Sequence, residues 1–155
     1  MAINSTAGFQ PKIDFPLANW IKTSALAHSS VLIGRCLFSF IFIMASFGHF
    51  SNSTINYAAS QGVPLPQVLV PLSGVLALLG GLSILLGYHA RIGALFIILF
   101  LVPVTLMMHN FWAITDVAQA QIQQIMFMKN LSMLGGALLV FNFGAGPVSF
   151  DERKH

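Results

Sequence analysis

The stretch PQVLVPLSGVLALLGGLSILLG (66–87), YH (88–89) and ARIGALFIILFLVPVTLMMH (90–109) decides the fold class. Two apolar runs follow one another here, each close to the roughly 20 residues that a helix needs to cross a bilayer. Strands of a membrane barrel would instead alternate polar and apolar side chains over about 10 residues. The short turn between the runs makes them antiparallel neighbours, so the stretch predicts a transmembrane helical hairpin.

Two further apolar runs, 31–50 and 122–143, lie on either side of this hairpin. The 155-residue chain is 56% hydrophobic and only 7% charged, whereas soluble domains have about 25% charged residues. We therefore predict an all-α, integral membrane four-helix bundle, with spans at about 31–50, 66–87, 90–109 and 122–143. Residues 1–30 would form a disordered or interfacial arm, 31–145 one domain, and 146–155 a cytoplasmic tail.

The distribution of charge predicts the orientation of this bundle. Five basic residues precede the first span, lie at the central turn, or follow the last span: Lys12, Lys22, Arg91, Arg153 and Lys154. The other two loops, 51–65 and 110–121, carry only Asp116. The positive-inside rule then places both termini in the cytoplasm. Arg35, near the cytoplasmic start of the first span, is expected to reach lipid phosphates, and no basic cluster indicates nucleic-acid binding.

Lys129 interrupts the fourth apolar run, in FMKNLSMLGG (127–136). Its spacing from Ser132 and Gly136 predicts that it points into the bundle, as charges inside membranes usually do. Three interpretations remain open. Lys129 snorkels to the interface or pairs with Asp116; it binds an electron-rich group such as a quinone carbonyl or a lipid phosphate; or it is uncharged in a dry site.

Two histidines, His49 and His109, each end a span that runs outward, so we expect both at one depth near the outer surface. They hydrogen-bond a polar ligand, or have no chemical role, or ligate a metal or haem iron. Metal ligation by His49 and His109 is the weaker alternative, because zinc sites usually have three or four protein ligands. The predicted ligand-binding set is Lys129, His49, His109, Asn130, Asn110 and Trp112. No catalytic motif is recognisable, so catalytic residues are not assigned.

Small residues spaced by four predict where helices pack closely. One row consists of Ser73, Ala77 and Gly81, and the other of Ser132 and Gly136.

Several segments resemble the DoxX family of small four-helix membrane proteins, with its MhqP/CatD-like and YphA-like bacterial members. They are GRCLFSFIFIMASFGHF (34–50), NYAASQGVP (56–64), LLGGLSILLGYHARIGAL (78–95), HNFW (109–112) and FMKNLSMLGGALLVFNFGAGPVSFD (127–151). Many members of that family carry a glutamate shortly before the second-span GG, where this chain has Ala77.

The resemblance implies a multi-pass protein of the bacterial inner membrane with both termini inside. It further implies an accessory role in quinone-linked redox chemistry or the response to quinone and oxidative stress. A quinone-like ligand would bind near the outer side, and a membrane or periplasmic oxidoreductase would supply electrons, because the chain has no cofactor motif of its own. The alternative is a non-enzymatic membrane scaffold or a carrier of small lipophiles. Homo-oligomerisation is left open.

The small-residue rows generate a test of packing. Gly136→Leu should lower the melting temperature in detergent, because a large side chain would separate packed helices, whereas Gly34→Leu should matter less. Equal melting temperatures for the two variants would contradict this assignment of the packing face.

Overall fold

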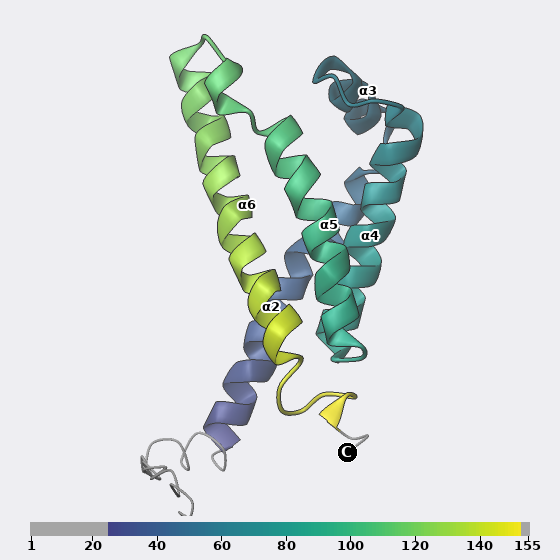
Figure 1. The fold of residues 1–155 in the computed structure, drawn as a ribbon, viewed down its shortest axis with the longest axis vertical. Helices are drawn as coiled ribbons and strands as arrows, with labels where there is room; N and C mark the ends of the chain where they lie inside the picture. Colours follow the sequence, from purple (N-terminus) through teal and green to yellow (C-terminus); the bar gives the residue numbers. More distant parts are fainter. Residues whose placement is uncertain (1–24, 153–155) are drawn as a thin grey trace, which may run out of the picture.

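The computed structural model describes residues 25–152. Its elements are α2 (Ala25–Gly48), α3 (Asn52–Ser60), α4 (Pro66–Leu86), α5 (Ala90–Met108), the 3₁₀ helix η1 (Phe111–Ala113) and α6 (Val117–Phe143) (Figure 1). No strand occurs among these described residues. Four helices are long and apolar enough to cross a membrane, namely α2, α4, α5 and α6. The prediction of an all-α membrane bundle of four helices is therefore confirmed.

Helices α2 and α6 begin earlier than the hydrophobic pattern predicts, at Ala25 and Val117. Asp116 explains the start of α6, since its carboxylate accepts a hydrogen bond from the backbone N–H of Gln119 at 2.8 Å. Such an N-cap satisfies one of the free amides of the first turn, so a helix can begin within polar sequence.

Parts of two predictions fall outside the described residues. The N-terminal arm lies mostly in 1–24, and the last three residues of the tail are 153–155. The charges used for orientation at both termini belong to these segments.

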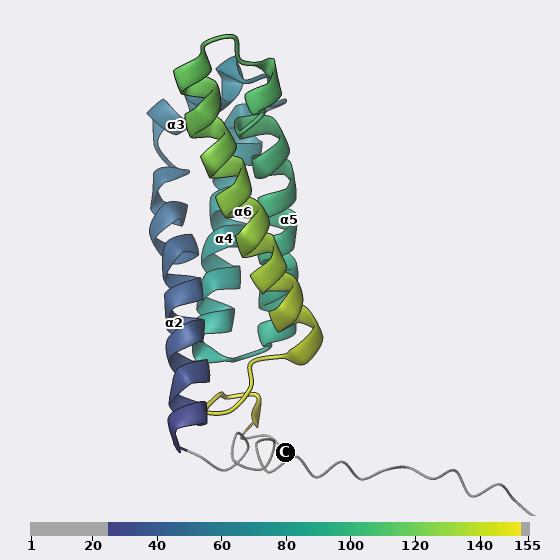
Figure 2. The same ribbon diagram turned by 90° about the vertical axis from the view of Figure 1, so that its left-hand side faces the viewer.

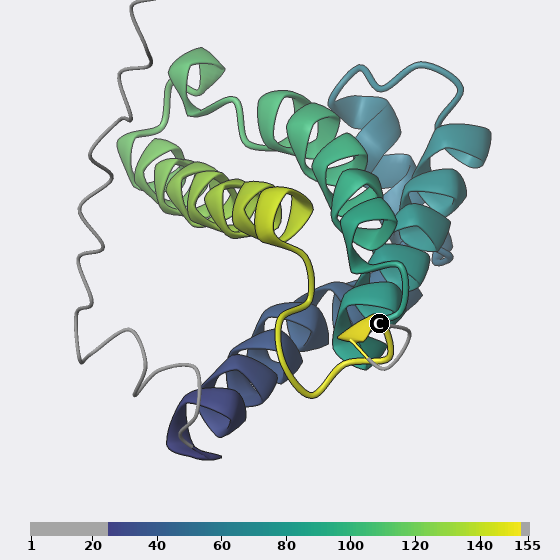
Figure 3. The same cartoon turned by 60° about the horizontal axis from the view of Figure 1, so that its bottom comes forward.

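The four long helices form a curved row in the order α2, α4, α5, α6. The packed neighbours are α2 with α4, α4 with α5, and α5 with α6. Figure 3 shows α2 and α6 at the two ends of this row, and Figure 2 shows the helices running side by side. We call the end of the bundle that carries α3 and η1 the α3 end, and the other the turn end, after the α4–α5 turn. Helices α5 and α6 diverge toward the α3 end (Figure 1).

Glycines on α4 bring its backbone close to both neighbours. A Cβ atom on Gly80 would lie 2.8 Å from the carbonyl oxygen of Gly93 on α5. On the other side, a Cβ atom on Gly81 would lie 2.8 Å from Ile43 of α2, and one on Gly74 would lie 2.7 Å from His49 Cβ. Two members of the predicted row, Ala77 and Gly81, are therefore buried at helix contacts, but the row missed Gly74 and Gly80, and Gly80 faces α5 rather than α2.

The ends of the row meet where the Phe38 ring of α2 lies against Gly136 of α6. A Cβ atom on Gly136 would be 2.8 Å from that ring, whereas Cβ atoms on Gly34 and Gly135 would meet nothing within 4 Å. This geometry supports the expected difference between the Gly136 and Gly34 variants. The other predicted member of the α6 row, Ser132, is exposed.

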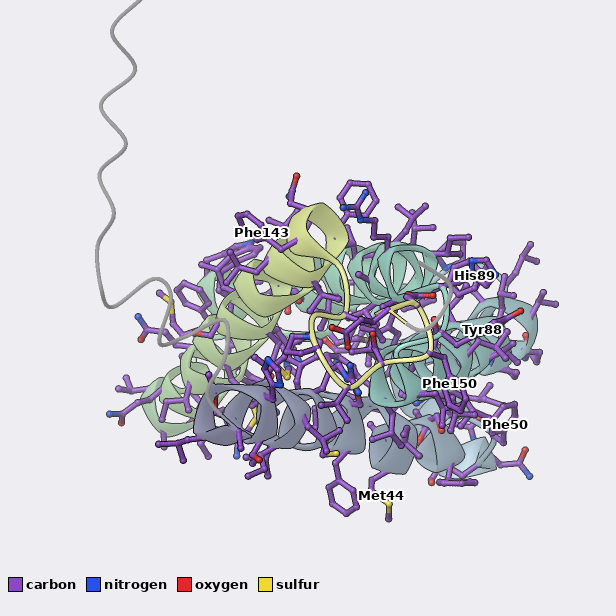
Figure 4. The ribbon with its side chains drawn as sticks, turned by 90° about the horizontal axis from the view of Figure 1, so that it is seen from below. Met44, Phe50, Tyr88, His89, Phe143 and Phe150 are labelled. Atoms are coloured by element: carbon purple, nitrogen blue, oxygen red, sulfur yellow. The ribbon has the colours of Figure 1, made fainter. Side chains whose placement is uncertain are left out.

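The segment after α6 crosses the turn end of the bundle (Figure 4). Arg35 holds this segment to α2. Arg35 is only 6% exposed, and it donates hydrogen bonds to the carbonyl oxygens of Ala145 at 3.1 Å and Val148 at 2.8 Å. The expectation that Arg35 reaches lipid phosphates is therefore wrong, because the side chain is buried and both of its terminal nitrogens donate to returning backbone, while Nε is buried without a partner among the described residues.

The same segment also caps α5. The carboxylate of Asp151 accepts hydrogen bonds from the backbone N–H groups of His89 at 2.8 Å and Ala90 at 3.0 Å. The Asp151 N–H donates to the carbonyl oxygen of Gly87 at 2.8 Å. Gly87 has φ of 64° and a Cβ atom there would lie 2.5 Å from Ser149, so glycine is required at this crossing. The segment thus joins α2 to the α4–α5 turn.

The α4–α5 contact yields a prediction about stability. Gly80→Ala should destabilise the protein by about 1–3 kcal/mol, because the added methyl meets backbone on α5 that cannot move alone. Gly135→Ala, on a glycine that faces open space, should be neutral or stabilising by up to about 1 kcal/mol through helix propensity. Unfolding in detergent followed by circular dichroism measures both, and equal destabilisation would contradict the close approach of α4 and α5.

Candidate functional site

A cavity of about 470 Å³ lies in the α3 half of the bundle. All five α helices contribute to its walls, and most of its lining is apolar. Its volume falls in the range of small-molecule sites, about 300–1,000 Å³. The polar side chains on its walls are His49, Thr54, Tyr57, Ser73, His109, Lys129 and Asn130.

Asn130 is the polar residue of α6 that faces the interior. It is 5% exposed and lines the cavity, and seven residues further along α6 Ala137 is fully buried on the same face. Within residues 25–152 the Asn130 amide has no hydrogen-bond partner. Its polar atoms are not among the fully buried ones left without a partner in this part of the chain, which are Arg35 Nε and Ser39 Oγ, so they are accessible from the cavity. The amide is therefore poised for a ligand or water.

Lys129 lies at the edge of the cavity and is exposed, so the prediction that it points into the bundle is wrong. Its Nζ lies 3.4 Å from the sulfur of Met126, one turn toward the α3 end. Pairing with Asp116 is also excluded, because the two residues share one helix and lie about 20 Å apart along it. The helix rotation that exposes Lys129 turns Asn130 inward.

His49 lies deep in the cavity. Its ring packs edge-on against Phe100 of α5, with 5.4 Å between the ring centroids. Its Nδ1 is 2.9 Å from the carbonyl oxygen of Ala45, one of the last carbonyls of α2. Free carbonyls at a helix C-terminus accept hydrogen bonds from such nearby donors. The position and ring orientation of His49 are thus fixed by α2 and α5 together.

His109 lies at the mouth of the cavity, where its Nδ1 is 2.7 Å from Oε1 of Gln123 on α6. Phe100, beside His49, is nine residues earlier on α5, which corresponds to about 13 Å of depth. The expectation that His49 and His109 lie at one depth is therefore wrong. One metal ion could join the two histidines only if their side chains spanned this separation, and it would need further ligands. No group of three metal-ligating side chains occurs in residues 25–152.

The depth of Asn130 follows from the same pair of helices. Asn130 is seven residues beyond Gln123 on α6, or about 10 Å deeper than the His109 level. Asn130 and His49 both line the cavity, from helices at opposite ends of the row. Phe42 and Phe100, whose rings meet edge to face at 6.3 Å, line it as well.

Two residues of the predicted set, Asn110 and Trp112, do not line the cavity. Trp112 is 60% exposed and packs against the rings of Phe111 and Phe127 where η1 meets α6. Asn110 precedes η1 and accepts a backbone hydrogen bond from Ala113 at 2.9 Å. The 3₁₀ turn carries both residues away from the cavity, so proximity in sequence to His109 is misleading.

The hydrophobic runs do not predict α3, which forms one wall of the cavity through Thr54 and Tyr57. The available signal was a capping pattern. Ser51 precedes the helix, and its hydroxyl accepts a hydrogen bond from the backbone N–H of Thr54 at 3.3 Å. Serine is a preferred N-cap residue, so SNST in loop 51–65 was compatible with a helix start.

A larger hollow of about 850 Å³ lies at the turn end, between α5 and the C-terminal segment. Its two acidic lining residues are already engaged with backbone. Asp151 caps α5, and Glu152 accepts a hydrogen bond from the N–H of Val148 at 2.7 Å. This hollow belongs to the fastening of the C-terminal segment, so the cavity near α3 is the stronger candidate site.

Comparison with known proteins assigns the family. A model described as the SURF4 family matches residues 22–155. The chain belongs to the SURF4 family. The predicted membership of the DoxX family is wrong, because the SURF4 model covers every segment on which that resemblance rested. Some residues in those segments have structural roles in this fold. Gly80 allows the close approach of α4 and α5, and Asp151 caps α5.

Two bacterial proteins of similar length resemble this SURF4-family chain. Inner membrane protein YqjF of Escherichia coli K12 is 35% identical over 129 residues, which cover 82% of this chain and 93% of YqjF. Inner membrane protein YphA of the same organism is 30% identical over 125 residues, or 79% of this chain and 89% of YphA. With the four apolar helices, these relatives identify the chain as a multi-pass inner membrane protein.

A eukaryotic relative matches over a shorter stretch. The ER-derived vesicles protein ERV29 of Saccharomyces cerevisiae is 32% identical over 80 residues, which cover 52% of this chain but 26% of ERV29. No solved structure is significantly similar to the chain.

Proposed function

We propose that this SURF4-family protein binds a small lipophile with a polar head in the cavity near α3. The observation that carries the proposal is Asn130, a residue only 5% exposed that lines an apolar cavity and whose amide has no hydrogen-bond partner in the described part of the chain. A bound molecule that pairs with this amide would take the place of water there.

The arrangement of helices supports entry of this lipophile from the membrane. Helices α2 and α6 are not packed neighbours. They meet where Phe38 lies against Gly136, on the turn side of the cavity. Nearer the α3 end, the cavity is lined from both helices, by Ile41 and Ala45 of α2 and by Met133 of α6. A molecule dissolved in the bilayer would enter between α2 and α6.

The ligand class that fits best is a quinone-like ring. His49 lines the cavity next to the end of α2, and Asn130 and Lys129 line it from α6. Phe100 offers an aromatic surface beside His49, on which a flat ring can stack or lie edge-on. A ring with oxygen atoms at opposite ends, each as a hydroxyl or a carbonyl, would direct one oxygen to His49 and the other to α6 and leave its tail in the apolar part.

The proposal is limited to binding or carriage of such a molecule. The accessory role in redox chemistry, with an oxidoreductase partner, came from the DoxX resemblance, and the SURF4 relatives offer it no support. A redox partner would be needed only if the bound ring changes its oxidation state on this protein.

The test uses two asparagines of α6. The protein is purified in mild detergent and its small molecules are extracted and identified by mass spectrometry. The amount of lipophile that co-purifies with Asn130→Leu should be at least tenfold lower than with wild type. The substitution removes a hydrogen bond to the ligand and also changes the shape of the cavity wall. Asn142→Leu is the matched control, since Asn142 is exposed and its amide donates only to the Leu138 carbonyl at 2.8 Å.

Lys129→Ala is the second variant and should weaken retention less than Asn130→Leu, because Lys129 is exposed. The proposal fails if wild type and all three variants retain the same molecules in the same amounts while melting at the same temperature. That result would favour the alternative of a membrane scaffold whose polar residues only complete the bundle.

The orientation remains part of the proposal, with the α3 end on the outer face of the inner membrane as the charge distribution predicts. Ser60 of α3 and Tyr88 of the α4–α5 turn are both exposed, and Cys36 is the single cysteine. In a Cys36→Ala background, Ser60→Cys should react with a membrane-impermeant maleimide in spheroplasts. Tyr88→Cys should react only after lysis, and the reverse pattern would invert the topology.

A further inference from the structure

The hydrogen bond of His49 fixes which of its ring nitrogens carries a proton. Its Nδ1 lies 2.9 Å from the carbonyl oxygen of Ala45. A carbonyl oxygen only accepts hydrogen bonds, so Nδ1 is the donor. In a neutral imidazole the other nitrogen, Nε2, then carries no proton and acts only as an acceptor.

No residue in 25–152 donates a hydrogen bond to His49 Nε2. The ring is half-buried in the cavity against Phe100, in surroundings that are mostly apolar. In this tautomer His49 cannot donate a hydrogen bond from Nε2 to a ligand carbonyl. An acceptor in an apolar site is matched by a ligand that brings its own O–H or N–H group.

The polar side chains on the α6 side of the cavity can donate hydrogen bonds to a ligand. The ammonium group of Lys129 only donates, and the amide of Asn130 both donates and accepts. A ligand oxygen on that side can therefore be an acceptor. Together the two sides of the cavity define a ligand with a donor at one end of its ring and an oxygen at the other.

We infer that the cavity takes a lipophile whose aromatic ring carries a hydroxyl group facing His49. A quinol or another alkylated phenol then binds in preference to the corresponding dione or ether. This inference rests on the proposed function, and it adds the chemical class of the ligand and the residue that selects it.

The experiment compares two redox-inert probes that differ in the donor alone, 4-nonylphenol and 4-nonylanisole. The full-length protein in lipid nanodiscs receives both at equal mole fraction, and native mass spectrometry measures the ratio bound. Wild type should favour the phenol by about tenfold, the scale of one hydrogen bond that would otherwise leave an acceptor unpaired.

Two matched variants test which histidine produces the preference for the phenol over the anisole. His49→Phe keeps an aromatic ring against Phe100 but removes the acceptor, so the bound ratio should fall to about one. His109→Phe alters the histidine at the mouth, about 13 Å from His49 in depth, and should leave the ratio unchanged.

The outcomes separate this inference from the function on which it rests. Equal binding of phenol and anisole to wild type, or loss of selectivity in His109→Phe rather than His49→Phe, would overturn the inference while leaving lipophile binding intact. If neither probe binds wild type and no lipophile co-purifies with it, both the inference and the proposed function are wrong.

Discussion

The close approach of α4 and α5 at Gly80 and Gly93 is the contact on which the remaining structure depends. Inside a bilayer, apolar surface gives no drive for helices to associate, so van der Waals contact between backbones has to hold them together. Gly80 faces α5 while Gly74 and Gly81 face α2, so α4 binds a neighbour on each side. Helix α5 in turn packs against α6. This chain of pairwise contacts produces a curved row of helices.

A row has two ends, and α2 and α6 at those ends are not packed along their length as the other neighbours are. Phe38 of α2 reaches Gly136 of α6 toward the turn end. The C-terminal segment strengthens that end, since Arg35 holds it to α2 and Asp151 holds it to α5. Nothing comparable joins α2 and α6 near the α3 end within the described chain. The rigid end and the open end of the bundle therefore follow from the same topology.

The positions of the polar groups in the cavity depend on where α2 ends and on how α6 is rotated about its axis. His49 belongs to the end of α2, which stops well short of the α3 end, so it lies beside Phe100 rather than beside His109. Asn130 faces inward because α6 is rotated toward the side that buries Ala137. These two facts give the α2 and α6 sides of the cavity different hydrogen-bonding character.

The sequence by itself determined the four long helices, the tight central turn and the membrane as solvent. Length, apolar composition and the need to satisfy backbone amides inside lipid leave little other choice. It also indicated that His49, His109, Lys129 and Asn130 belong near one end, and all four line the cavity. Only the tertiary structure decided which faces pack, that Arg35 binds returning backbone, and that Asn130 rather than Lys129 is buried. The reason is physical: a helix that is apolar on every side has no hydrophobic stripe to reveal its inner face, so its rotation is set by small-residue contacts with partners distant in sequence.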